Sequence, residues 1–420
     1  MNRVIVFLVL IFWSAGYGLN LDEAIRQALQ NHPYIRQERA FLNSAKYEFY
    51  STYGNFLPKV SFNYTYSKSY GVDPIDYFGR NYSFSVNWDI YSSGQNLTLY
   101  KIKKFMFKSK EKSFNEIVLD IIYQVKKAYY KACANKEIFR LRSIQLRAAI
   151  KNYQMAKKKL NLGLVTKADF LQAKVRLENV RYSLITAEND YKKSIAELNS
   201  LIGRPINLDT EVDEKSLMNI EGKNIPEFSK IKDVAFRRPI ISQYLNDIKT
   251  SKYQVLQSKL TFTPSIFINY SSNRDFNSLY GSDAYRMLKI GLSWTIFSGL
   301  SRYYSYLSAK ENERYYRYRL KELKRNLTLN LYNLYLDLLT AYKNLEVSKT
   351  MLQEAERNFK QALGEYKTGK GDIISLLTAE TYLANARETY VKSLLNIALS
   401  KSILEREMGI DNLHLVGKLQ

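Results

Sequence analysis

Two stretches of this sequence are nearly alike, and together they decide the fold. "FSVNWDIYSSGQ" runs from Phe84 to Gln95, and "IGLSWTIFSGLS" runs from Ile290 to Ser301. In both, apolar or aromatic side chains alternate with small or polar ones, and a long charged run follows. Alternation with a period of two is typical of a β-strand that has one apolar and one polar face. The sequence therefore predicts the same strand-to-helix junction twice in one chain.

These two junctions belong to a longer internal repeat. Trp88 and Trp294 lie 206 positions apart. The same offset aligns Pro33 with Pro239, Pro58 with Pro264, Gly163 with Gly369, Ala173 with Ala379, and Gly203 with Gly409. Ordered matches at one offset indicate a duplication, and the period is too long for a solenoid repeat. We expect a first repeat over 19–205, a linker over 206–230, a second repeat over 231–410 and a C-terminal tail over 411–420.

Each repeat is predicted to contain two strands of roughly 9–11 residues, the length that a tilted membrane strand needs. The strand pairs span 59–91 and 265–297. Their aromatic and apolar face is expected to form a lipid-facing belt that includes Phe62, Tyr64, Phe84, Trp88, Trp294 and Ile296. Strands of a soluble β-sandwich alternate in the same way, so the pattern by itself leaves that alternative open.

The rest of each repeat is predicted to be helical. A short helical region precedes each strand pair. In the first repeat, Asp22 is the expected N-cap of this region. Apolar residues then recur every seven positions, accompanied by alanines, as in a closely packed coiled coil. The expected long helices cover 95–162 and 300–368, and the expected return helices cover 168–202 and 372–408. A long helix of this size would extend for on the order of 100 Å.

Composition argues against an enzyme. Residues 1–18 have a basic start and a short apolar stretch, which predicts a secretory signal peptide. Cys133 is the only cysteine and His32 and His414 are the only histidines, so a His/Cys metal site is close to excluded. We expect no cofactor. The net charge of +23 is spread along helical runs beside Glu and Asp, which is typical of solvated helices and gives little support to nucleic-acid binding.

Four membrane strands cannot stand alone. An open sheet leaves two unpaired edges, and each unsatisfied backbone group costs several kcal/mol in hydrocarbon. The smallest single-chain barrels have eight strands. Several copies of the chain are therefore expected to contribute strands to one shared barrel.

At this point the sequence resembles the TolC-like outer membrane efflux proteins, from "LDEAIRQALQNHP" to "LEREMG". The most specific parts are "LNLGLVTKADFLQA" and "EYKTGKGDIISLLTA", together with "YSSGQ" and "FSGLS". The resemblance implies a mainly α fold with membrane β: a homotrimer with a 12-stranded β-barrel in the outer membrane and a long coiled-coil helical tunnel in the periplasm. It implies an exit duct of a tripartite efflux pump or a type I secretion system. Its partners would be a periplasmic adaptor and an inner-membrane transporter.

The resemblance also assigns roles near the two helical turns. Asp169 and Tyr366 match residues that hold the closed state, and we hypothesise that they bond with help from Lys367 or Lys370, with Asp372 close by. Alternatively, Asp169 only caps its helix. The matched adaptor contacts are Gly163, Leu164 and Gly369. Gly371 replaces a family arginine, and Ser375 and Thr378 replace two aspartates of an acidic ring, which puts cation selectivity in doubt.

A different class of function also fits part of the pattern. An exported coiled-coil tether or spacer without channel activity would share the signal peptide, the long helices and the charge. It would not explain an aromatic strand face opposite a Ser/Asn/Thr face. For a duct, the alternatives for the transported substrate are a drug, a metal ion and a protein.

Overall fold

The computed structural model describes residues 18–70, 77–213, 215–218, 225–278 and 281–410. Apart from Gly18, the expected signal peptide lies outside the described residues, as does the expected tail. The chain forms two compact units, and both repeats contribute to each. The first unit comprises 1–36, 117–235 and 328–420, and the second comprises 37–116 and 236–327.

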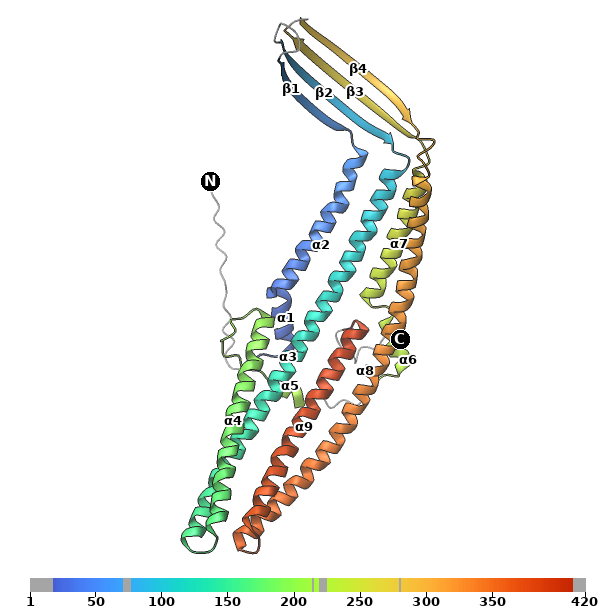
Figure 1. The fold of residues 1–420 in the computed structure, drawn as a ribbon. Coiled ribbons are helices and arrows are strands. Elements are labelled where there is room, and N and C mark those ends of the chain that lie inside the picture. The colour runs from blue at the N-terminus through green and yellow to red at the C-terminus, as the bar shows by residue number, and fades with distance from the viewer. Residues whose placement is uncertain (1–17, 71–76, 214, 219–224, 279–280, 411–420) are drawn as a thin grey trace. The chain divides into compact units, whose positions relative to one another are not determined.

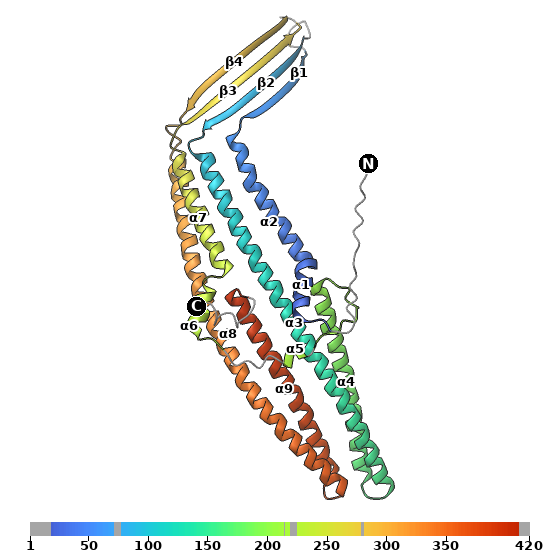
Figure 2. The same cartoon turned by 180° about the vertical axis from the view of Figure 1, so that it is seen from behind.

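The second unit contains one antiparallel sheet (Figures 1 and 2). Its strands are β1 (Lys59–Ser69), β2 (Tyr77–Tyr91), β3 (Ser265–Asn277) and β4 (Gly281–Ser293), in the order β1-β2-β3-β4. The two hairpins of the two repeats are joined by pairing of β2 with β3. The strands are 11, 15, 13 and 13 residues long, so the expected length of 9–11 residues was too short for three of them.

A short helix precedes each hairpin. These are α2 (Pro33–Ser51), which is followed by the 3-10 turn η1 (Thr52–Phe56), and α7 (Pro239–Leu260). The buried Glu116 carboxylate accepts hydrogen bonds from the Arg238 guanidinium, at 2.6 Å from Nη2, and from the Ile240 amide at 2.8 Å. Because Pro239 begins α7, this carboxylate both pairs with a cation and satisfies an amide of the first helical turn.

The first unit contains the greater part of two helical hairpins, whose long helices begin in the second unit. The first hairpin joins α3 (Gln95–Asn161) to α4 (Lys167–Ile202), and the second joins α8 (Ser301–Thr368) to α9 (Ile373–Met408). Figures 1 and 2 both show the lower parts of these hairpins side by side. Their bounds differ from the expected helices by one residue at most at each end. The residues that recur every seven positions are buried or half-buried, and among them Val125 and Leu331 are both at 0 % exposure.

Alanines bring the two helices of each hairpin close together. In the first hairpin Ala149 packs against Leu177 and Val180. In the second, residues at the same repeat positions, Ala355, Leu383 and Ala386, form the matching cluster. A small residue lets the backbones approach, and the larger side chains opposite fill the space. The duplicated seam therefore packs in the same way in both repeats.

The N-terminal segment and the linker are packed against α3. Helix α1 (Leu21–Asn31) is capped by the Asn20 side chain, which accepts from the Glu23 amide at 2.8 Å, so Asp22 is not the cap as expected. Asp22 lies inside the first turn, two residues beyond the cap position. In the linker, Val212 and Leu217 are buried, and Leu19 forms an isolated parallel bridge with Val212.

Two short helices lie in or beside the linker, α5 (Lys215–Met218) and α6 (Phe228–Ala235). The Tyr129 hydroxyl, from the buried side of α3, donates to the Leu19 carbonyl at 2.9 Å. No helix within the described ranges combines the length and the apolar character that a bilayer crossing requires.

Candidate functional site

The sheet has one face with an apolar band. The register places Val60 opposite Val86, Val86 opposite Tyr270, and Tyr270 opposite Leu288. Paired residues of an antiparallel sheet point to the same side, so these four side chains form one row across the sheet. Neighbouring pairs on this face include Phe62 with Phe84, Tyr64 with Tyr82, Trp88 with Ile268, and Ile268 with Ile290.

This band is exposed and bounded. Phe62 is 65 % exposed and Ile290 is 72 % exposed, so nothing in the described chain covers them. Toward the strand ends farther from the helices, the same face carries Arg274 and Arg286. A large apolar patch on a protein surface marks a contact with lipid or with another apolar surface.

The opposite face of the sheet is mostly polar. Its rows contain Ser61 with Ser85 and Ser271, and Asn87 with Asn269 and Lys289. The Ser61 and Ser85 hydroxyls are hydrogen-bonded at 2.7 Å, and the Asn269 amide donates to Asn87. The predicted division into an apolar and a polar face is therefore present in the sheet.

Two tryptophans are fixed at the helix-proximal ends of the strands. The Trp88 indole donates to the Phe56 carbonyl at 3.1 Å, and the Trp294 indole donates to the Phe262 carbonyl at 3.0 Å. These two bonds join equivalent positions of the two repeats. The expectation that Trp294 and Ile296 lie in a strand was wrong, because β4 ends at Ser293 and the chain then turns toward α8. Both side chains are exposed, Ile296 at 80 %.

The second strand of each hairpin leads into its long helix through two consecutive left-handed residues. These are Ser93 and Gly94 in the first repeat, and Gly299 and Leu300 in the second. A left-handed conformation is costly for a residue with a Cβ atom. The Ser93 hydroxyl lies 2.8 Å from both the Thr263 and Pro264 carbonyl oxygens, which helps to hold it there.

The two hairpin turns have the same backbone. We call residues 154–172 the first tip and residues 360–378 the second tip. Gly163 and Gly369 adopt φ values of 69° and 83°. The next amide in each tip bonds back across the turn, Leu164 to the Lys159 carbonyl at 2.9 Å and Lys370 to the Glu365 carbonyl at 3.0 Å. This is the helix C-cap geometry that favours glycine.

The helices that leave the turns are capped at equivalent positions by different residues. In the first tip, the Asp169 amide donates to the Thr166 hydroxyl at 3.1 Å, and the Asp169 carboxylate accepts from the Thr166 amide at 2.9 Å. In the second tip, the Ser375 amide donates to the Asp372 carboxylate at 2.7 Å. The Ser375 hydroxyl donates to the same carboxylate at 2.9 Å. Asp169 and Asp372 are therefore both capping residues.

Tyr366 is one of the most enclosed residues of the second tip. It is 1 % exposed and packs with Ile373 and Leu376, and Met155 of α3 joins that cluster. Lys159, also from α3, donates to the Tyr366 carbonyl at 2.6 Å, and its ammonium lies 4.0 Å from the centre of the Tyr366 ring. One lysine thus combines a hydrogen bond to a C-terminal helical carbonyl with a cation–π contact. It joins the two hairpins.

The tyrosine and the aspartate that were expected to bond are close but not hydrogen-bonded. The buried Tyr366 hydroxyl has no hydrogen-bond partner within the described chain. Burial raises the pKa of Tyr366, and the nearby Asp169 carboxylate raises it further, so the phenol keeps its proton. Lys367 and Lys370 are exposed, and neither side chain makes an ion pair in the described ranges. The lysine that contacts Tyr366 is Lys159.

Farther along the hairpins, a buried carboxylate connects three helices. Glu380 of α9 is 4 % exposed. Its Oε2 accepts from the Asn152 amide of α3 at 2.9 Å, and its Oε1 lies 3.7 Å from Nε of Arg176 in α4. Oε1 and two guanidinium nitrogens of Arg176 have no hydrogen bond in the described structure. Burial raises the pKa of Glu380, and Arg176 opposes that rise.

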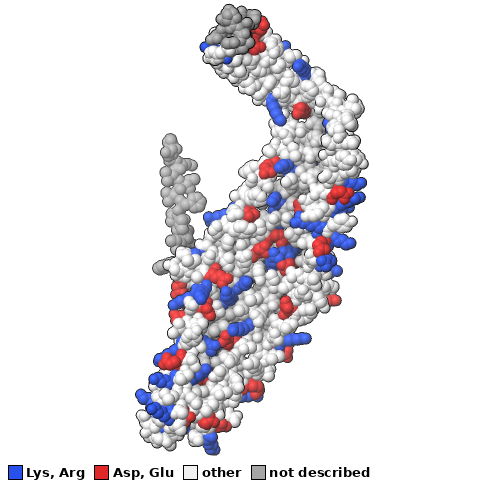
Figure 3. Space-filling view, viewed as in Figure 1, with Lys and Arg blue, Asp and Glu red and all other residues white. Residues whose placement is uncertain are grey.

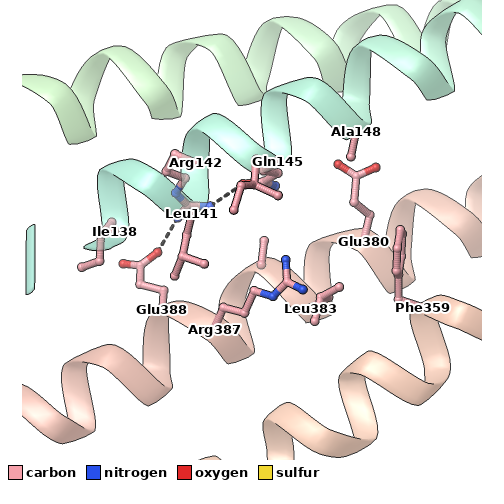
Figure 4. Close-up of a pocket in the computed structure, with 12 residues that line it drawn as sticks. Ile138, Leu141, Arg142, Gln145, Ala148, Phe359, Glu380, Leu383, Arg387 and Glu388 are labelled. Atoms are coloured by element: carbon pink, nitrogen blue, oxygen red, sulfur yellow. Dashed lines mark hydrogen bonds and ion pairs between the residues drawn. The ribbon is translucent and has the colours of Figure 1, made fainter. Parts of the chain in front are cut away.

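A second polar link between the hairpins borders a cavity of about 220 Å³. Arg142 of α3 bonds Glu388 of α9 and also donates to Gln145 at 2.8 Å (Figure 4). Glu380 and Arg387 lie on the same side of the cavity as Glu388, and Leu141 and Leu383 contribute to its apolar lining. The two hairpins are therefore joined by polar contacts at several levels.

Sequence reasoning missed Lys159, Arg142, Arg176 and Glu380. Each lies in a charged helical run whose pattern is typical of a solvent-exposed face. The local pattern around such a residue does not indicate which residue of another helix it contacts. One signal was present for Glu380: the repeat places Lys174, an exposed residue, at the equivalent position. A change of charge between matched positions could have marked a specialised residue.

Comparison with known proteins agrees with this geometry. The sequence profile of the family described as "Outer membrane efflux protein" matches residues 24–204 and 231–409. The chain belongs to this family. The two matched segments also correspond to the two repeats inferred from the 206-residue offset.

Individual relatives are distant but cover most of the chain. Protein CyaE of Bordetella pertussis is 21 % identical over 384 residues, covering 89 % of this chain and 80 % of its own. Outer membrane protein TolC of Escherichia coli is 20 % identical over 435 residues, covering 96 % and 84 %. The crystal structure of the Campylobacter jejuni CmeC outer membrane channel superposes with a TM-score of 0.80 at 16 % identity, covering 93 % and 85 %.

Family membership establishes the general role and location. The protein is an outer membrane exit duct of an efflux or secretion system, with a helical extension in the periplasm. The family consists of channels rather than enzymes, and this favours the duct over the tether.

Proposed function

We propose that three copies of this chain assemble into one duct, with a shared 12-stranded β-barrel in the outer membrane and a tunnel of helices in the periplasm. The observation that carries this proposal is the open sheet. Its outer strands, β1 and β4, each have one edge without a paired strand in the described chain. Pairing β4 of one copy with β1 of the next would satisfy those edges, as hydrocarbon requires.

The two faces of the sheet fit this assembly. The apolar band around Phe62, Tyr64, Phe84 and Trp88 would face lipid, and the rows of Ser and Asn would face water inside the barrel. Trp294 and Ile296, just beyond β4, would belong to the boundary of the band on the side of the helices. Aromatic residues are enriched at that level of membrane proteins.

The tips are the proposed docking end. Leu164 is 68 % exposed, and Gly163 and Gly369 have open space where a Cβ atom would lie. A periplasmic adaptor would contact these turns and couple the duct to an inner-membrane transporter, which supplies the energy. The transported substrate would be selected mainly by that transporter.

Closure of the tips is proposed to depend on Tyr366, with Lys159 as the principal cation. Lys159 already ties the first hairpin to the Tyr366 carbonyl. Asp169 lies close enough to influence the Tyr366 hydroxyl, and Lys367, Lys370 and Asp372 surround the same turn. In this tip latch, a small movement of the hairpins would let the orphaned hydroxyl donate to the Asp169 carboxylate.

The assembly is tested by the native mass of the particle extracted from outer membranes in mild detergent. A protein mass near three chains supports the shared barrel. A monomer, or a particle that stays in solution without detergent, would contradict it, because the strand edges and the apolar band would then have no cover.

The tip latch is tested by single-channel conductance in planar bilayers. Lys159→Met removes the hydrogen bond and the cation–π contact, and we expect a larger or more frequently open conductance. Lys159→Arg keeps a donor and a cation and is the matched control. Equal conductance of all three proteins would show that Lys159 does not hold the tips closed.

A further inference from the structure

Some of the cations along the helices of this protein are paired with acids. On α8, for example, Arg314 bonds Glu311 at 2.6 Å and Arg325 bonds Glu322 at 2.6 Å. These are pairs within one turn of a helix, and each arginine is largely neutralised where it stands. The uncompensated positive charge of the chain lies where such pairs are missing.

The tips are such a place. Six of their lysines are exposed and make no ion pair with any described residue: Lys157, Lys158, Lys167, Lys360, Lys367 and Lys370. The seventh tip lysine, Lys159, is engaged with Tyr366. On the face shown in Figure 3, blue side chains lie at the lower end of the helices.

The acids of the tips do not balance these lysines. The first tip has four Lys and one Asp, a charge of +3, and the second has three Lys, one Glu and one Asp, a charge of +1, which gives +4 per chain. The carboxylates of Asp169 and Asp372 accept capping hydrogen bonds, and Glu365 accepts from Gln361 at 3.0 Å. Contact between Lys159 and Tyr366 brings the two basic turns to one place.

We propose that the paired tips bind multivalent anions and make the periplasmic entrance of the duct favour anionic over cationic passengers. The inference rests on the proposed assembly, because several copies would surround the entrance with free ammonium groups. Like charges gathered around an opening raise the local concentration of counter-ions. Lysine is a mobile point charge with three donors, which suits phosphate and carboxylate groups presented in varied orientations.

The probe is inorganic tripolyphosphate, added to one side at a time of a planar bilayer that contains the channel. We expect it to block current from the tip side only. The block should weaken strongly between 0.1 M and 1 M salt, where the screening length falls from about 10 Å to about 3 Å. Hexaamminecobalt(III), a trivalent cation of compact size, should block much less.

The variant Lys157→Gln/Lys167→Gln/Lys360→Gln removes three free charges across both tips and leaves the proposed latch intact. We expect its block by tripolyphosphate to be roughly tenfold weaker. Its matched control is Lys310→Gln/Lys321→Gln/Lys349→Gln, which removes three exposed lysines of α8 outside the tips. The control should be blocked like the parent. An equal loss in both variants would mean that the total charge matters rather than the tips, and would overturn the inference.

Isothermal titration of tripolyphosphate into the detergent-extracted protein makes the test independent of conductance. Saturable binding that is lost in the tip variant supports the site. If the channel conducts but tripolyphosphate neither blocks the current nor binds, the duct is supported and the anion site is contradicted. A protein that binds the anion but shows no current steps would instead contradict the duct.

Discussion

The two tips cap their departing helices with the same kinds of group in opposite order. In the first tip a threonine is the N-cap, and the aspartate three residues later accepts a hydrogen bond from the threonine amide. In the second tip an aspartate is the N-cap, and the residue three positions later is a serine. Thr166 corresponds to Asp372 and Asp169 to Ser375, so hydroxyl and carboxylate have changed places. The turn glycine and the bond across the turn are the same in both tips. The comparison shows that the turn requires one acceptor at the cap and a second polar group, but does not require a particular order.

The exchange has a consequence for the site. Because the carboxylate of the first tip lies inside the helix, it comes near Tyr366, and Asp169 is only partly exposed. The carboxylate of the second tip lies at the cap and is exposed. Beyond the turns the repeats differ further, since Glu380 is buried and Lys174, its counterpart, is exposed. The two repeats therefore place their charged residues differently at matched positions.

The largest difference between the repeats should appear on replacing Glu380. Glu380→Leu leaves Arg176 in a mostly buried position without its acid, which should cost about 3 kcal/mol. Lys174→Leu, at the matched position, should change stability by less than about 0.5 kcal/mol. Thermal unfolding followed by circular dichroism in mild detergent ranks the variants. The double variant Arg176→Met/Glu380→Leu should recover much of the lost stability. If the double variant is no more stable than Glu380→Leu, the loss is due to packing rather than to the unpaired charge.

The same carboxylate should give the protein a specific pH dependence. Burial raises the pKa of folded Glu380 above its unfolded value, so its contribution is most favourable below the unfolded pKa. That contribution is lost as the pH rises through the folded pKa. Glu380→Gln cannot ionise, so the melting temperature of the parent relative to this variant should fall as the pH rises from about 4 toward neutrality. A constant difference between the two proteins would contradict a raised pKa.

Much of the fold was predictable because it depends on periodicity and on breakers. The helix ends at Gly163 and Gly369 and the alternating strand faces follow from single residues and short patterns. The end of β4 was missed because Trp294 continues the alternation although its indole is tied to a carbonyl outside the sheet. The contacts at the site were less predictable, because pairs such as Lys159 with Tyr366 join residues 207 positions apart. Such pairs depend on how two hairpins pack, which no local pattern encodes.

A smaller effect is expected from moving the first-tip carboxylate. Thr166→Ala should cost about 1 kcal/mol, as loss of a helix cap does. The exchange Thr166→Asp/Asp169→Ser copies the second tip, so it should restore that loss while removing the carboxylate from beside Tyr366. Stability measured by thermal unfolding and conductance measured in bilayers then separate capping from closure. If the exchanged protein is stable but conducts more, Asp169 helps to hold the tips shut; if it is stable and conducts normally, Asp169 only caps its helix.

The smallest change is the loss of one oxygen atom at Tyr366. Within a single chain its buried hydroxyl has no hydrogen-bond partner, and burying such a group costs roughly 1–3 kcal/mol. Tyr366→Phe should therefore leave the melting temperature unchanged or raise it slightly, because the ring keeps its packing and its contact with the Lys159 ammonium. Leu160 occupies the matched position of the first repeat, so Leu160→Ile, which preserves apolar packing, is a suitable control. A clear loss of stability in Tyr366→Phe would mean that the hydroxyl donates a hydrogen bond in the assembled duct. Asp169 is the first candidate for the acceptor. Combining Tyr366→Phe with a substitution of Asp169 would then test that pair.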